Sequence, residues 1–156
     1  MTMRSLYTQV SWPRGRRPKR ADLLDRLHAA MPWAELIALV EPHYPKPSSG
    51  RPPHPLPVMV RIRVLQWAFR LSDAAVEDLI LDSHAAARFV GIDPWSPRPP
   101  GASSIQRFRS IVDDVLGARF WALVFMGIEV GSTEFRQGAI REPVLRLRRA
   151  KTSKSV

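Results

Sequence analysis

The sequence of 156 residues contains no cysteine. Disulfides, zinc sites with thiolate ligands and thiol nucleophiles are therefore excluded. Long apolar runs are also missing, since the longest, from Phe120 to Val130, is far shorter than the ~20 residues of a membrane span. The N-terminus carries charges but no apolar core of a secretory signal. We therefore expect a cytoplasmic protein with no membrane partner.

Motifs that would carry chemistry are missing as well. The sequence has neither a nucleophile elbow nor a phosphate-binding glycine loop. Its four histidines include no pair at i,i+4 spacing, so they form no metal motif. Glu77 and Asp78, like Asp113 and Asp114, are neighbours that would point about 100° apart on a helix instead of converging on one metal. We find no active site, and we expect no enzyme activity, cofactor or metal.

Basic residues are concentrated at the two ends of the chain, which has a net charge of +10. Residues 1–20 hold six and residues 146–156 hold five of the 24 lysines and arginines, and neither segment contains an acid. The remaining 13 lysines and arginines nearly balance the 14 acidic residues, so the middle of the chain is nearly neutral. Basic ends on a balanced body are typical of proteins that hold phosphate backbones, although basic tails can also serve solubility alone.

Apolar residues recur at helical spacing through most of the chain, and no strand-like alternation is found. The pattern predicts helices over residues 21–31, 33–41, 57–69, 73–91, 103–116 and 118–126. We therefore predict an all-α fold, a small bundle of about five to six helices. This bundle would occupy residues 20–128, between a flexible basic arm at 1–19 and a basic, disordered tail at 129–156.

Proline is concentrated in residues 42–57, here called the strap, which hold seven of the fifteen prolines. Such a stretch favours extended, PPII-like backbone with little entropy left to lose on ordering. The next helix would begin at Pro57, because a missing N–H leaves nothing unpaired at a first helical position. We expect the strap either to lie along a DNA duplex, with Arg51 on a phosphate, or to brace the helices on either side of it.

Several residues are predicted to define the helices after the strap. Helix 57–69 would bury one face, with Arg63 and Gln66 mostly off it. Ser72 and Asp73 are plausible caps for helix 73–91, and Gly91 is a left-handed stop. Ser103, followed three residues later by Gln106, is a capping-box pattern for helix 103–116.

Helix 103–116 is the candidate reader of DNA. Its predicted buried stripe consists of Ile105, Phe108, Val112 and Val115. The residues left off this stripe include types that reach guanine, adenine and phosphate from the major groove. Free N–H groups at the serine-rich start of the helix could also bind a phosphate. The residues predicted to bind DNA, here and elsewhere in the chain, are Arg14, Arg16, Arg17, Lys19, Arg51, Ser104, Gln106, Arg107 and Arg109.

Two alternatives stay open for this helix. An amphipathic helix with two arginines is often only a solvated core helix, and Arg109 could be anchored to an acid inside the fold. Helix 73–91 could serve as the first helix of a helix-turn-helix-like arrangement, but the loop after it is longer than the three or four residues usual in that motif.

The order of segments resembles the N-terminal region of InsH-like transposases, the insertion-sequence-five group of DDE recombinases. The resemblance covers residues 20 to about 125. It is carried by EPHYPK from Glu41 to Lys46, GRPPHPL from Gly50 to Leu56, LSDAAVEDL from Leu71 to Leu79 and RFVGI from Arg88 to Ile92. Single residues that add to it are Trp33, Met59, Arg61, Leu65, Gln66, Ile105, Phe108 and Arg109.

The resemblance implies a bacterial, nucleoid-associated domain that binds the terminal inverted repeats of an insertion sequence during DNA transposition. In that family a catalytic domain follows, in which three carboxylates hold two divalent metals such as Mg²⁺. In this sequence Glu142 stands roughly where the first catalytic Asp is expected, Pro143 follows it directly, and no acid lies further on. We therefore expect a truncated transposase that has no catalytic domain and is inert alone as a recombinase.

A second hypothesis is a protein–protein module that pairs with itself or with full-length transposase as an inhibitor. It depends on the apolar residues Phe120, Trp121, Val124 and Phe125, which would be left exposed without a following domain. A third is a non-functional remnant.

Overall fold

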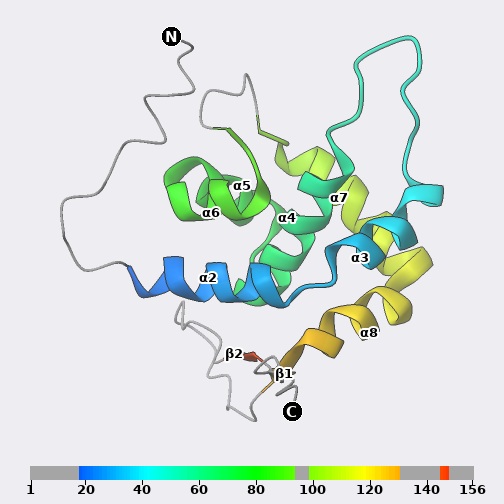
Figure 1. Cartoon of the computed structure of the whole chain (residues 1–156). Helices are drawn as coiled ribbons and strands as arrows, with labels where there is room; N and C mark the ends of the chain where they lie inside the picture. The colour runs from blue at the N-terminus through cyan, green and yellow to red at the C-terminus, as the bar shows by residue number, and fades with distance from the viewer. Residues whose placement is uncertain (1–17, 94–98, 131–144, 148–156) are drawn as a thin grey trace, which may run out of the picture.

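Helices make up most of the described chain, which comprises residues 18–93, 99–130 and 145–147 of this computed structural model (Figure 1). The predicted all-α class is confirmed. No helix in these ranges is both long and apolar enough to cross a membrane. The helices are α2 Lys19–Ala30, α3 Trp33–Val40, the 3₁₀ turn η1 Glu41–His43, α4 Leu56–Phe69, α5 Asp73–Asp82, α6 His84–Val90, α7 Ala102–Ser110, the π-helix η2 Ile111–Leu116 and α8 Gly117–Gly127.

Helix α4 lies at the centre of the bundle and packs against α3, α5, α6 and α7 (Figure 1). Because neighbours surround it, α4 is buried on nearly all sides instead of on the single predicted face. Even Gln66, predicted to lie mostly off the core, is 2% exposed. Its other buried residues are Met59, Val60, Ile62, Val64, Leu65 and Ala68.

The segment predicted as one helix over 73–91 is two helices, α5 and α6. Ser83 separates them with an extended backbone (φ −116°, ψ 112°), and its hydroxyl accepts a hydrogen bond from the Ala86 N–H at 3.3 Å. The predicted ends of the segment are confirmed. The Ser72 hydroxyl accepts from the Ala75 N–H at 3.1 Å, and Gly91 ends α6 with φ 81°.

Helix α7 begins with a cap that the sequence did not predict. The expected capping box of Ser103 and Gln106 is wrong, because α7 starts at Ala102, after Gly101, and has no side-chain N-cap of its own. The carboxylate of Glu77, from α5, instead accepts a hydrogen bond from the Ala102 N–H at 2.9 Å. An acceptor 25 residues away in sequence therefore stabilises the start of α7.

The π-helix η2 changes which residues are buried after α7. Ile105, Phe108 and Val112 are buried as predicted, but Leu116 replaces Val115, which is 59% exposed. A π-helix has i→i+5 hydrogen bonds and so turns less per residue than an α-helix, which moves the buried face along by one position.

Helix α8 buries part of the apolar run that was predicted to be exposed in the absence of a following domain. Phe120 and Val124 lie in the core with no exposed surface, so the expectation that they are exposed is wrong. Phe125 and Met126 are exposed. Trp67 of α4 contacts this helix through the rings of Trp121 and Phe125, with centroids 5.7 and 5.4 Å apart.

A short antiparallel ladder follows α8, where no strand was predicted. Strand β1, Ile128–Val130, pairs with β2, Leu145–Leu147, with Ile128 opposite Leu147. The other residues of the predicted tail, including Glu142 and Pro143, lie outside the described residues.

Candidate nucleic-acid interface

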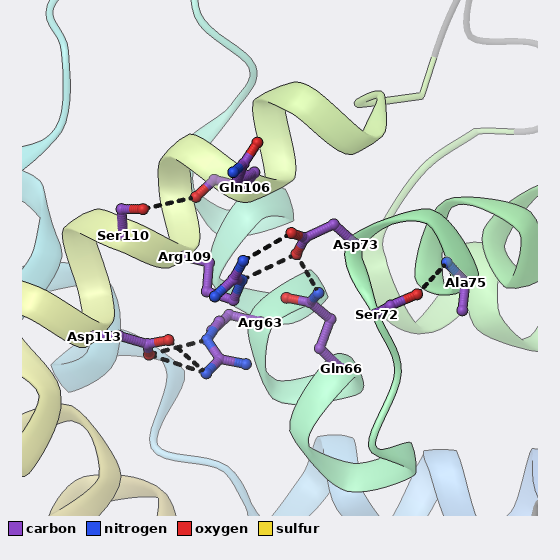
Figure 2. Close-up of polar contacts among 9 residues, drawn as sticks. All are labelled: Arg63, Gln66, Ser72, Asp73, Ala75, Gln106, Arg109, Ser110 and Asp113. Carbon is purple, nitrogen blue, oxygen red and sulfur yellow. Dashed lines mark hydrogen bonds and ion pairs between the residues drawn. The ribbon is translucent and has the colours of Figure 1, made fainter.

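The outward face of α7 consists of polar side chains. Gln106 and Arg107 are exposed and Ser104 is partly exposed. No hydrogen bond or ion pair joins the side chains of Gln106 and Arg107 to any residue that the structure describes. The Ser110 hydroxyl donates to the Gln106 carbonyl at 3.2 Å, within the same helix (Figure 2). The structure thus leaves two of the predicted base-reading side chains available to a ligand.

Arg109 is anchored to an acid of the fold, the alternative that the sequence had left open. Its Nε and Nη2 donate to the two carboxylate oxygens of Asp73 at 3.1 and 2.9 Å (Figure 2). Buried Gln66 donates to the same carboxylate at 2.8 Å. The hydrogen bonds from Arg109, and with a smaller effect the one from Gln66, lower the pKa of Asp73 although burial opposes them. Arg109 therefore joins α7 to α5 instead of facing outward like Arg107.

A second ion pair fixes the helix just beyond α7. Arg63 of α4 donates from Nη2 to both oxygens of Asp113, at 2.9 and 3.1 Å (Figure 2). The same guanidinium lies 4.8 Å from the ring centre of Trp121. Charged and bidentate pairs of this kind are among the stronger hydrogen bonds in proteins. Together the two arginines hold α7 and η2 against the centre of the bundle, which gives the outward face of α7 a fixed orientation.

An open cavity of about 420 Å³ lies beside these two ion pairs. Arg63, Arg70, Asp73 and Arg109 are among the residues that line it. Gln66 also lines it, and its Oε1 is buried without a hydrogen-bond donor in the described part of the chain. The sequence did not predict this cavity, because its residues come from α4, α5, α7 and η2 and meet only in the folded chain.

The start of α7 is a less suitable phosphate site than the sequence indicated. Free N–H groups at a helix N-terminus attract anions. Here the Glu77 carboxylate already accepts from the Ala102 N–H. A phosphate at this position would meet a like charge, so the structure argues against this part of the prediction.

The strap is fastened to the bundle next to α7. The Tyr44 hydroxyl donates to the His54 carbonyl at 2.6 Å, which ties the two ends of the strap together. The Tyr44 ring also packs edge-on against Phe108 of α7, with centroids 5.9 Å apart. Partial burial, with a further effect from Arg51, lowers the pKa of His54. Arg51 itself is exposed, like Lys46.

Of the predicted contacts from the N-terminal arm, only Lys19 belongs to the described residues. Lys19 is exposed in the first turn of α2, which packs against α6. Arg14, Arg16 and Arg17 lie outside the described residues. Within the described ranges no three residues of the types His, Cys, Asp and Glu gather as a metal site would require.

The fold and this surface define a small all-helical domain whose polar helix face is held in place by ion pairs. A family model described as "Transposase domain (DUF772)" matches residues 13–110, from the basic arm to the end of α7. The match covers more than half of the chain, and the chain belongs to this family of transposase domains, the N-terminal domain of InsH-like transposases. No solved structure matches the chain.

Proposed function

We propose that this chain binds duplex DNA as a transposase-derived domain and recognises the terminal inverted repeats of an insertion sequence. The observation that carries the proposal is the outward face of α7, a braced helix. There Gln106 and Arg107 are exposed, and their side chains have no partner among the described residues. Arg pairs with the O6 and N7 of guanine and Gln with the N6 and N7 of adenine in the major groove. Ser104, which is partly exposed on α7, would contact a phosphate.

The basic ends would supply affinity that does not depend on sequence. Each phosphate that a cation neutralises releases a counterion, which favours binding at low salt. Lys19 and the arginines at positions 14, 16 and 17 would act in this way. The place of Lys19 on α2, a different helix from α7, fits a division between phosphate contacts and base reading.

We assign no cutting step to this chain. Asp73 and Asp113, two carboxylates beside α7, are each engaged by an arginine. Binding to DNA would therefore need no Mg²⁺ or other cofactor. Mg²⁺ would serve only a catalytic domain of the kind that follows this domain in the family.

The proposal is tested by selecting duplexes from a random library with the purified chain. Binding of the selected duplex and of a scrambled duplex is then measured by fluorescence anisotropy. We expect the selected sequence to bind at least tenfold more tightly, a difference of ~1.4 kcal/mol. Failure to enrich any sequence, or equal binding of both duplexes, would overturn the proposal.

A second candidate function rests on α8. Phe125 and Met126 are 46% and 64% exposed and extend the aromatic cluster of Trp67 and Trp121. Such a patch could pair with a second copy or with full-length transposase, as an inhibitor would. Light scattering separates the two candidates. A dimer indifferent to DNA would favour pairing, and a monomer that binds duplex would favour DNA recognition.

A further inference from the structure

The strap projects from the bundle beside α7 and forms the cyan-to-teal loop at the upper right of Figure 1. Tyr44 closes its base by bonding to His54 and packs on Phe108 of the same helix that carries Arg107. Because Tyr44 holds the closed base of the loop against α7, the strap leaves the bundle from a fixed place beside that helix. A duplex lying on α7 would therefore meet the strap at a defined place.

The tip of the strap is thin and positively charged. Ser48, Ser49 and Gly50 carry no bulky side chain, and no atom lies within 4 Å of the position that a Cβ on Gly50 would occupy. Gly50 has φ 143°, a backbone conformation that favours glycine. Arg51 follows directly and is exposed. No acid occurs between residues 42 and 72, so nothing on the strap competes for this guanidinium.

The prolines that follow Arg51 favour an extended backbone, which sets how far the tip of the strap can extend from its base. Pro52 and Pro53 follow Arg51 and favour PPII backbone, which rises ~3.1 Å per residue. The shorter limb, from Gly50 to His54, could then extend about 12 Å, and the arginine side chain reaches further. Neighbouring major and minor grooves are half a turn apart, roughly 17 Å on a duplex whose turn is 34–36 Å. The strap is therefore long enough to approach the groove next to the one that α7 would occupy.

We propose that the strap inserts Arg51 into the minor groove next to α7 and makes the chain prefer A·T base pairs there. This inference rests on the proposed DNA binding and adds a second recognition site to it. Narrow A·T minor grooves concentrate negative potential and attract arginine, which is more weakly hydrated than lysine. The amino group of guanine projects into the minor groove, where A·T pairs offer only the acceptors adenine N3 and thymine O2. A thin tip of Ser and Gly fits such a groove.

Base analogues test the proposal, because they change one groove and spare the other. Inosine in place of guanine removes the minor-groove amino group and keeps the major-groove O6 and N7 acceptors. Diaminopurine in place of adenine adds that amino group and keeps the major-groove pattern. The analogues are placed block by block along the selected duplex. Affinity is then measured for the wild-type chain and for the variants Arg51→Ala, Arg51→Lys and Lys46→Ala. Lys46→Ala is the control, because it removes another exposed cation of the strap.

The expected result is one A·T block beside the α7 site where diaminopurine weakens wild-type binding about tenfold. An inosine–cytosine block in the same place is tolerated. Arg51→Ala loses this discrimination and Arg51→Lys loses most of it, while Lys46→Ala keeps it. Both substituted positions are exposed, and matching thermal unfolding midpoints exclude misfolding.

Two results would overturn the inference without affecting the proposed function. One is a selected duplex that binds tightly but shows no block sensitive to the minor groove. The other is an Arg51→Ala variant that loses the same factor on every probe, which would make Arg51 a phosphate contact. Wild-type protein that binds no duplex at all would instead overturn the proposed function itself.

Discussion

Arg107 and Arg109 lie two residues apart on α7 and point in nearly opposite directions, because each helical residue turns the side chain by about 100°. Arg109 turns inward and pairs with Asp73, while Arg107 is exposed. The periodicity placed both residues off the apolar stripe. It could not choose between them, because the acid that selects Arg109 lies 36 residues away.

At the same scale, Asp73→Asn should make the stability of the chain less dependent on pH. A carboxylate whose pKa is lowered in the folded state stabilises the fold above its unfolded pKa of ~3.9 and loses that effect as the pH falls through the lower folded value. At pH 7 the variant should be less stable by about 1–3 kcal/mol in urea unfolding. The difference should shrink as the pH falls below ~4.

The matched control for this prediction is Asp78→Asn, an exposed acid on the same helix. It should change stability by less than about 0.5 kcal/mol at either pH. A deficit of Asp73→Asn that stays constant as the pH falls would mean that the ion pair with Arg109 contributes nothing through its charge.

At the scale of elements, two helix ends set by local signals were predicted correctly, whereas the local capping box of Ser103 was wrong and the long-range contacts were not predicted. Ser72 and Gly91 act on their own helix ends, so the sequence around them was sufficient. The cap of α7 comes from Glu77 on another helix. The full burial of α4 likewise depends on the neighbours that surround it, and a sequence pattern does not show them.

The two possible caps of α7 can be compared directly. Glu77→Ala should destabilise the chain by about 1–2 kcal/mol, because it leaves the Ala102 N–H without its acceptor. Glu77→Gln should cost less, since an amide oxygen can still accept. Ser103→Ala should change stability by less than about 0.5 kcal/mol, whereas a capping box would make it the costly change. Thermal and urea unfolding of the three variants measure these differences.

At the scale of the whole molecule, the proposed phosphate contacts and the proposed base reading belong to different parts of the chain. Basic residues are concentrated in the arm and the tail, and the middle of the chain is nearly neutral. The distribution of charge along the sequence alone was enough to predict this. The all-α class also followed from periodicity. The assembly of α7, the strap and the two ion pairs did not, because it joins residues far apart in sequence through contacts such as Arg63 with Asp113 and Tyr44 with Phe108.

Removal of residues 1–17, which leaves α2 intact, should reduce the dependence of binding on salt. The deleted arm carries four arginines. If all four contact phosphates, the slope of log K against log salt should become less negative by roughly 3.6. The preference for the selected over the scrambled duplex should survive. An unchanged slope would show that the arm does not touch DNA.

The most direct test of recognition by α7 is the affinity of Arg107→Ala for the selected and the scrambled duplex at one salt concentration. The control is Arg26→Ala, which removes an exposed arginine from α2. Loss of a base contact should cost Arg107→Ala about 1–3 kcal/mol on the selected duplex and little on the scrambled one. Arg26→Ala should lower both affinities by small and similar amounts. An equal loss on both duplexes for Arg107→Ala would contradict base reading by α7.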